Sequence, residues 1–341
     1  MTERSGDVAL LDRHDAVLLD LDGTVYRGNE PIAGAAEAID HVRTRGTAVR
    51  FVTNNASKAP AEVADHLRGV GVAAGLDEVS TSSQAAAGIL AERLAGGANV
   101  LVVGTGALAA EIDGLGLRAV RKVGAEVGDI AAVVQGHSPK TTWADLAEAC
   151  VAIRAGAPWV ACNLDATLPT ERGELPGNGA MVAALRAATG AEPVVAGKPR
   201  PPLFTSAAES ANATSALVVG DRLDTDIAGA VAAGLPGLAV LTGVLTPERL
   251  LAAEPSERPR YLGADLGALT AKAAELEIGP RAGWRIEDTG SVLTVSAAGD
   301  GEGKALQLLR ALCAEAWRTG TTAVKAADDA ASAALSELRL A

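Results

Sequence analysis

Aromatic side chains are scarce in this chain of 341 residues. Phenylalanine, tyrosine and tryptophan make up 2% of the sequence, although 48% of the residues are hydrophobic. A core must therefore be built from alanine, valine, leucine and isoleucine, which suits many close contacts between helices and sheets. The scarcity also argues against a site that stacks nucleic-acid bases on aromatic rings.

A basic excess is lacking as well, because 42 acidic residues outnumber 30 basic ones and give a net charge of −12. Neither nucleic acid nor an anionic membrane is an expected partner, since both need clustered lysine and arginine. No apolar run is long enough for a transmembrane helix, and the charged N-terminus does not resemble a secretory signal. The three cysteines, Cys150, Cys162 and Cys313, have neither metal-ligand spacing nor a disulfide framework. We expect buried thiols and a cytoplasmic protein.

Short apolar runs alternate along the chain with segments whose apolar residues have helical spacing. This alternation predicts an α/β fold with a doubly wound, Rossmann-like parallel sheet. The expected strands are Ala16–Asp20, Ala48–Thr53, Asn99–Val103, Ala131–Gln135, Trp159–Cys162, Pro193–Ala196, Ala216–Val219 and Leu238–Leu241.

Two acids, Asp20 and Asp22, end the first expected strand and are followed by Gly23 and Thr24. A strand period of two places both carboxylates on one face. Their closeness is electrostatically costly unless a cation or a proton lies between them. The alternative interpretation is ordinary turn chemistry, for which Asp-Gly is also suited.

Further polar residues follow later strands: Thr53, Lys198, Asp221 and, a little further on, Asp226. The carboxyl ends of parallel strands converge on one crevice of a doubly wound sheet. A hydroxyl, an ammonium and several carboxylates are therefore expected to meet there. Carboxylate oxygens suit Mg²⁺, and a lysine suits phosphate oxygens.

These motifs, taken in order, resemble those of the haloacid dehalogenase superfamily of phosphohydrolases over about residues 12–275. The resemblance implies that Asp20 is the nucleophile that becomes an aspartyl-phosphate, and that Asp22 is the general acid and then the general base. It also implies that Thr53 and Lys198 bind the phosphoryl oxygens, that Asp20, the backbone carbonyl of Asp22 and Asp221 bind Mg²⁺, and that Asp226 is a supporting residue. Asn54, directly after Thr53, is a further candidate for phosphate binding, and Gly23 and Thr24 support the turn after the first strand. Asp226 would orient Lys198 or metal-bound waters.

About a hundred residues between Thr53 and Lys198 exceed what one crossover needs. We interpret residues 83–192 as an inserted α/β cap domain, residues 1–82 and 193–278 as the phosphatase core, and residues 279–341 as a small C-terminal α+β module. The resemblance is to the branch with a large α/β cap, in particular to phosphoglycolate and glycerol-3-phosphate phosphatases. Dimers built through the caps are common in that branch, so a homodimer is compatible with the resemblance.

The expected substrate loop is Asn163–Gly179, with a solvated surface loop as the alternative. The candidates in this loop for contacting the leaving group are Asn163, Asp165, Thr170, Glu171 and Arg172. A further candidate is Asn55, which follows the strand Ala48–Thr53. The segment Gly136–Thr142 departs from the branch, because it has lost an aspartate and gained Lys140. The polar loop favours a small hydroxylated leaving group, with glycerol 3-phosphate as the first choice and phosphoglycolate as the second.

The C-terminal module is expected to hold two strands, a glycine-rich turn at Gly299–Gly303 and a helix from Lys304 to Thr319. This order weakly resembles the second half of a GNAT-type acetyltransferase, whose glycine turn holds an acyl-CoA pyrophosphate. The acceptor-binding half is absent, so we expect a structural appendage, with a site for an acyl-CoA-like ligand as the alternative. Other interpretations of the whole chain are a phosphomutase or phosphotransferase with the same chemistry, and a regulatory protein with an inactive core.

Overall fold

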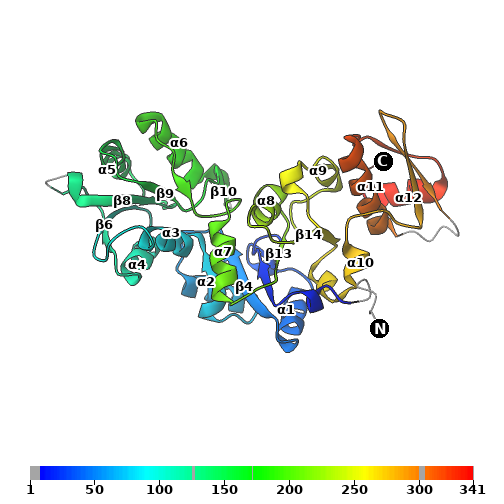
Figure 1. Ribbon diagram of the computed structural model, residues 1–341, viewed down its shortest axis with the longest axis horizontal. Coiled ribbons are helices and arrows are strands. Elements are labelled where there is room, and N and C mark those ends of the chain that lie inside the picture. The colour runs from blue at the N-terminus through cyan, green and yellow to red at the C-terminus, as the bar shows by residue number, and fades with distance from the viewer. Residues whose placement is uncertain (1–7, 125–126, 171, 299–303, 341) are drawn as a thin grey trace. The chain divides into compact units, whose positions relative to one another are not determined.

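The computed structural model describes residues 8–124, 127–170, 172–298 and 304–340 (Figure 1). The chain divides into two compact units. The first comprises residues 1–50, 70–72 and 210–341, and the second comprises residues 51–69 and 73–209. Within the described residues, no helix has both the length and the apolar character needed to cross a membrane.

The first unit is built on a parallel sheet with the strand order β15-β14-β13-β1-β4. Every residue of β1, β13, β14 and β15 is buried, as expected when helices cover both faces of a parallel sheet. Its strands are β1 (Ala16–Leu19), β4 (Ala48–Thr53, of which residues 48–50 belong to this unit), β13 (Ala216–Gly220), β14 (Gly237–Val240) and β15 (Tyr261–Gly263).

Short helices and one small hairpin complete this part of the first unit. A π-helical turn, Leu223–Ile227, runs directly into α8. The helices are α1 (Ala35–Thr44), α8 (Ala228–Ala232), α9 (Pro247–Leu251) and α10 (Ala273–Leu276), the 3₁₀ turns are Leu11–Arg13, Pro255–Glu257 and Leu266–Thr270, and the hairpin pairs β2 (Tyr26–Arg27) with β3 (Glu30–Pro31).

The C-terminal segment of the first unit forms a three-stranded sheet with two helices. Its elements are β16 (Trp284–Asp288), β17 (Leu293–Ala297), α11 (Ala305–Thr319), β18 (Val324–Ala326) and α12 (Asp329–Glu337). One apolar cluster joins this segment to the parallel sheet, since it includes Leu308 and Leu312 of α11 together with Ala239 and Leu262. The expected glycine turn at 299–303 lies outside the described residues.

The second unit contains a five-stranded parallel sheet with the order β12-β9-β8-β6-β7. The end of β4 also pairs there with β5 (Val79–Thr81). The sheet strands are β6 (Asn99–Val103), β7 (Arg118–Val120), β8 (Ile130–Gln135), β9 (Trp159–Ala161) and β12 (Val194–Val195), and a separate hairpin pairs β10 (Thr167–Thr170) with β11 (Gly173–Pro176). The helices are α2 (Pro60–Gly69), α3 (Ser82–Ala91), α4 (Gly106–Gly114), α5 (Trp143–Arg154), α6 (Asn178–Thr189) and α7 (Pro202–Ser210), and the 3₁₀ turns are Leu76–Glu78 and Val127–Asp129.

The α/β class and the parallel sheets confirm the fold expected from the sequence. Where a loop was expected at Asn163–Gly179, the structure has an antiparallel hairpin, which Gly173 turns with a φ of 101°. All three cysteines are free thiols; Cys162 and Cys313 are buried, but Cys150 is only half-buried.

Candidate active site

Three carboxylates of the first unit come together at the carboxyl ends of its central strands. Asp20 follows β1, Asp221 follows β13, and Asp226 lies on the π-helical turn. One ligand oxygen of each lies within 4.8 Å of the others, and Asp221 and Asp226 are 2% and 1% exposed. Like charges this close need a cation or protons to offset their repulsion. The donor set fits a hard divalent cation such as Mg²⁺, which binds carboxylate oxygens at about 2.1 Å.

The carboxylate of Asp221 lies against two glycines. A Cβ atom on Gly23 or Gly243 would overlap it, and Gly23 also has a φ of 90°. Asp221 Oδ2 accepts a hydrogen bond from the Val244 backbone N–H at 2.8 Å. Thr242 Oγ1 donates to the Gly23 carbonyl at 2.6 Å and so ties the loop after β14 to the loop after β1. Sequence reasoning did not assign the loop after β14 to the site. Its place after a parallel strand was a usable signal, because the carboxyl ends of such strands lie at one edge of the sheet.

Asp226 is held against the start of its own turn. A Cβ atom on Gly220 would overlap its carboxylate, and its Oδ2 accepts from the Arg222 backbone N–H at 3.1 Å. The Arg222 guanidinium instead binds Asp224 through two hydrogen bonds of 3.1 and 2.8 Å. These bonds lower the pKa of Asp224. Asp226, expected to orient other groups, thus lies within the carboxylate cluster itself.

Asp22 and Thr24 occupy contrasting environments. Asp22 is exposed. The loop around it is closed by a hydrogen bond of 2.7 Å from the Gly23 N–H to the Tyr26 carbonyl. Thr24 is fully buried, and within the described residues its Oγ1 has no hydrogen-bond partner. Thr24 therefore packs in the interior of the first unit.

In the second unit, Lys198 follows β12 and is 3% exposed. Its Nζ donates to the Val52 carbonyl at 3.3 Å. The Asn54 side chain binds the Lys198 backbone twice, accepting from its N–H at 2.8 Å and donating to its carbonyl at 3.0 Å. The neighbouring Thr53 ends β4, and its Oγ1 accepts from the Asn55 N–H at 3.1 Å. Asn54, which directly follows Thr53, thus joins the end of β4 to the backbone of Lys198.

A buried asparagine pair continues this arrangement. Asn163, 4% exposed, donates to the Asn54 carbonyl at 2.7 Å and accepts from the Asp165 N–H at 3.2 Å. Asn178, 1% exposed, donates to the Asn163 carbonyl at 2.8 Å. The Asp165 carboxylate accepts from Asn54 Nδ2 at 3.3 Å. Asn163 therefore holds the loop rather than presenting its amide to solvent, and Asn178, which sequence reasoning missed, supports it.

Three of the remaining candidates, Asn55, Thr170 and Arg172, are exposed. Thr170 and Arg172 lie at the β10–β11 turn, where Thr170 Oγ1 donates to the Gly173 carbonyl at 2.8 Å and accepts from the Arg172 N–H at 3.2 Å. Glu171 lies outside the described residues. Asn55 is exposed, and its Oδ1 accepts from the backbone N–H two residues further on at 2.8 Å. The second unit thus presents two groups of candidates, one around Lys198 and one on the hairpin turn.

A parallel sheet with a carboxylate cluster at its strand ends fits a hydrolase that uses a divalent cation, and comparison with known proteins identifies the family. Residues 17–118 match the family of haloacid dehalogenase-like hydrolases, and residues 195–269 match a HAD-hydrolase-like family. Residues 281–340 match a GCN5-related N-acetyltransferase like domain. The chain belongs to the haloacid dehalogenase-like hydrolases.

Among its relatives, the chain is 49% identical to the D-glycerol 3-phosphate phosphatase of Mycobacterium tuberculosis over 339 residues, covering 96% of this chain and 94% of that protein. The crystal structure of the M. tuberculosis glycerol phosphate phosphatase in complex with magnesium superimposes with a TM-score of 0.92, at 50% identity, covering 98% and 99% of the two chains. An acid sugar phosphatase of Staphylococcus saprophyticus is 36% identical over 258 residues, covering 75% and 96%. The predicted enzyme class, a phosphatase, is confirmed.

Proposed function

We propose that this chain is a Mg²⁺-dependent phosphomonoester hydrolase whose substrate is glycerol 3-phosphate. The observation that carries the proposal is the cluster of Asp20, Asp221 and Asp226 at the carboxyl edge of a parallel sheet. The substrate assignment is supported by the M. tuberculosis relative, which is named for that activity and matches this chain over nearly its whole length.

Two aspartates carry the covalent chemistry in this account. Asp20 attacks the phosphorus atom, and the bond to the leaving oxygen breaks as an aspartyl-phosphate forms. Asp22 donates a proton to that oxygen, so that glycerol leaves as an alcohol. Asp22 then takes a proton from the water molecule that hydrolyses the aspartyl-phosphate. The exposure of Asp22 supports this exchange of protons.

The negative charge of the phosphoryl group is offset by lysine and by metal. Thr53 and Lys198 bind the phosphoryl oxygens, and Asn54, whose side-chain amide is engaged by the Lys198 backbone, positions the lysine. The oxygens that would hold Mg²⁺ come from Asp20, Asp221, Asp226 and the Asp22 backbone carbonyl. The bound ion supplies charge neutralisation for phosphoryl transfer.

Residues 83–192 are proposed to form a cap domain that contacts the leaving group and excludes water. Four strands of the five-stranded sheet, β6 to β9, lie within this range, and together with the hairpin Thr167–Pro176 they support this role. In this account, Asp165, Thr170, Glu171 and Arg172 contact the glycerol moiety, together with Asn55. The buried Asn163 holds the base of their loop.

For residues 279–341 we infer a structural role. The support is the apolar cluster that this segment shares with the parallel sheet of its unit. An acyl-CoA-like ligand is the alternative, and calorimetry of the full-length protein with CoA separates the two. A homodimer and a cytoplasmic location are further proposals; the three free thiols support a reducing compartment, and light scattering tests the dimer.

The test is phosphate release from a panel of small esters, measured with Mg²⁺ and with EDTA. The panel includes glycerol 3-phosphate, phosphoglycolate, pyridoxal phosphate and nucleoside monophosphates. The proposal predicts Mg²⁺-dependent release with a preference for glycerol 3-phosphate. A preference for phosphoglycolate would keep the reaction and change the substrate. The absence of release from every ester, with turnover that requires a bisphosphate activator, would replace the hydrolase with a mutase.

A further inference from the structure

The second unit has a point at which the connections of its sheet diverge. Strand β6 lies between β7 and β8. The chain leaves β6 through α4 to reach β7 on one side, and it leaves β8 through α5 to reach β9 on the other. In open α/β sheets, the crevice outside the carboxyl ends of two such strands is the usual place for a ligand.

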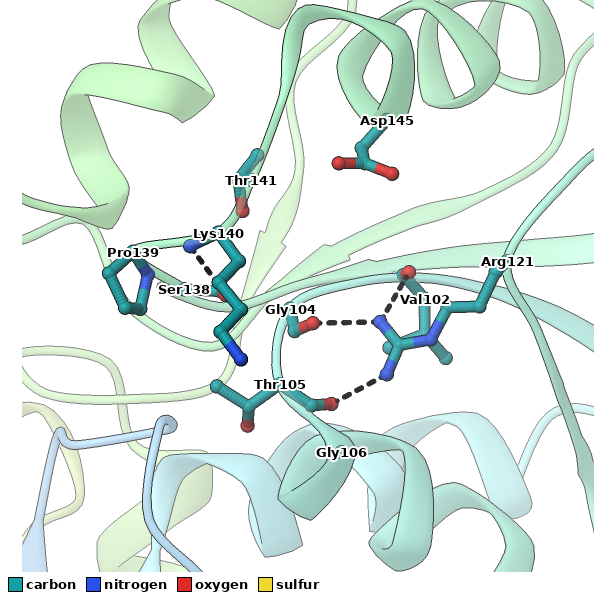
Figure 2. A pocket seen from close by; sticks show the side chains of 10 residues that line it. All are labelled: Val102, Gly104, Thr105, Gly106, Arg121, Ser138, Pro139, Lys140, Thr141 and Asp145. Carbon is teal, nitrogen blue, oxygen red and sulfur yellow. Dashed lines mark hydrogen bonds between the residues drawn. The ribbon is translucent and has the colours of Figure 1, made fainter.

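A cavity of about 420 Å³ opens there, between the loop after β6 and the loop after β8 (Figure 2). It is lined by Val102 and Gly104–Gly106 on one side, by Ser138–Thr141 on the other, and by Arg121 and Asp145. None of these residues belongs to the proposed catalytic or substrate-binding set. The volume falls at the lower end of the range of about 300–1,000 Å³ that is typical of small-molecule sites.

Arg121 fixes a positive charge at the end of β6. Its guanidinium donates to the carbonyls of Val102 at 3.1 Å, Gly104 at 2.7 Å and Thr105 at 2.8 Å (Figure 2). Because three acceptors hold the group, little side-chain freedom remains to be lost when an anion binds. The carbonyls carry only partial charges, so the guanidinium keeps most of its charge, which the nearby Asp145 carboxylate offsets in part.

Lys140 brings a second positive charge from the opposite loop. Figure 2 shows its side chain extending between the two loops toward Thr105. Its backbone N–H donates to Ser138 Oγ at 3.2 Å, which fixes the start of the side chain. Within the part of the chain that the structure describes, its ammonium has no hydrogen-bond or ion-pair partner. The loop after β8 thus supplies a cation to this cavity.

Some polar groups around the cavity already have hydrogen-bond partners in the protein, and others do not. Thr105 makes no side-chain bond to the start of α4, and the first turn of α4 contains no acid. The carboxylate of Asp145, by contrast, accepts from the Thr142 N–H and Oγ1 at 2.8 Å, and these bonds lower its pKa. The hydroxyl oxygens of Thr105 and Thr141 are buried and have no hydrogen-bond partner among the described residues. The one carboxylate in the lining is therefore held in its charged form, and the two cations, Arg121 and Lys140, outnumber it.

We propose that this cavity binds a small molecule through a phosphoryl group, held by Lys140, Arg121 and the backbone N–H groups that open α4. The phosphoryl oxygens would accept from the ammonium and from the first-turn amides. A bare phosphate ion leaves part of the volume unfilled, so the remainder takes a short organic group. This is a second anion site, separate from the residues that carry out hydrolysis.

The test uses the full-length protein labelled with ¹⁵N-glycine and kept in EDTA, so that its readout does not depend on turnover. Inorganic phosphate and ethylphosphonate are titrated in separate arms against sodium chloride of matched ionic strength. The amide signals of Gly104 and Gly106 are followed, and that of Gly106 is identified by its loss in Gly106→Glu. A Cβ atom on Gly106 meets nothing within 4 Å, so this variant is accommodated and places a negative charge at the mouth of the cavity.

We expect saturable shifts of both glycine signals. Lys140→Gln weakens the binding about tenfold, as loss of a charge-assisted hydrogen bond implies. Gly106→Glu abolishes the shift of Gly104, and Lys325→Gln, which changes an exposed lysine of the first unit, leaves it unchanged. Shifts with inorganic phosphate alone identify the free ion as the ligand, and shifts with both probes identify an organic phosphate. Unmoved glycine signals in both arms, or unchanged affinity in Lys140→Gln, would overturn the proposal.

Discussion

The side-chain amide of Asn54 holds the backbone of Lys198 at both of its polar groups. Oδ1 accepts from the Lys198 N–H at 2.8 Å, and Nδ2 donates to the Lys198 carbonyl at 3.0 Å. The two residues lie 144 positions apart in the sequence. Asn54 thereby fixes the backbone from which the nearly buried Lys198 side chain extends. Asn54 is itself held by Asn163, whose side chain donates to the Asn54 carbonyl.

Asn54→Ala is therefore expected to lower kcat/KM by about a hundredfold, because a displacement of about 1 Å at a reacting group costs that much. The Mg²⁺ concentration needed for half-maximal activity should stay unchanged, since the carboxylate cluster contains no second-unit residue. Steady-state kinetics over a range of Mg²⁺ concentrations separate the two effects. A kcat/KM of Asn54→Ala equal to that of the wild type would contradict the positioning role of Asn54.

Gly243→Ala should weaken Mg²⁺ binding. The added methyl group overlaps the Asp221 carboxylate and must push it out of the cluster. We expect the half-saturating Mg²⁺ concentration to rise at least about tenfold, as is typical when the support of a metal ligand is lost. The control is Gly88→Ala in α3, where a Cβ atom meets nothing within 4 Å. An equal response of the two variants would contradict this explanation.

The cysteines should differ in reactivity. Burial raises the pKa of Cys162 to about 12 and also raises that of Cys313, and only the thiolate reacts with disulfide reagents. With such a reagent at pH 8, the thiol of the half-buried Cys150 should be modified first in the native protein, whereas all three thiols should react in denaturant. Rapid modification of Cys162 or Cys313 in the native protein would contradict the burial of these two side chains.

The same shift predicts a dependence of stability on pH. The folded state keeps the Cys162 proton up to about pH 12, while the unfolded state releases it near the ordinary value of 9.0. Between these values the unfolded chain binds fewer protons, so the free energy of unfolding should fall as pH rises. Urea titrations of wild type and Cys162→Ala between pH 8 and pH 11 measure how far the free energy of unfolding falls with pH. The fall should be smaller in the variant than in the wild type. Parallel curves would contradict it.

The C-terminal segment should contribute to the stability of its unit through Arg310. This side chain is 4% exposed and donates two hydrogen bonds, of 3.0 and 2.6 Å, to the Leu262 carbonyl in β15. Burial lowers its pKa to about 10, so it stays charged at neutral pH. Arg310→Met should lower the free energy of unfolding by about 2–3 kcal/mol, the cost of leaving a buried partner unsatisfied.

The matched control for this prediction is Arg318→Met on the same helix. Arg318 is exposed and bonds to Glu315 one turn away, so its replacement should leave stability nearly unchanged. Denaturant unfolding of both variants checks the contrast. Equal stability of Arg310→Met and wild type would mean that the segment packs on the sheet without this contact.

Most of the sheet could be read from the sequence because its strands are short apolar runs ending at polar residues. Ala48–Thr53 and Asn99–Val103 have the bounds that were expected. The strand Val79–Thr81 was missed because two of its three residues are polar and yet buried. The signal that remained was the capping box between Thr81 and Gln84, which marks the start of α3.

The site was less predictable than the sheet, because its contacts join distant segments. Asp20 and Asp221 could be assigned to one edge from their strands alone. The fit of Gly243 against Asp221, and the burial of Asn163 beneath Asn54, depend on tertiary packing that no local pattern encodes. Polar residues in a glycine-rich stretch were expected to face a ligand, whereas Asn163 satisfies buried backbone groups instead.

The measurement that tests the central claim most directly is phosphate release from glycerol 3-phosphate by Asp20→Asn and wild type at equal Mg²⁺ concentration. The substitution retains the shape of the side chain but removes the nucleophilic carboxylate, so we expect Mg²⁺-dependent release by the wild type and none above background by the variant. Comparable release by both proteins would show that Asp20 is not the nucleophile and would contradict the mechanism.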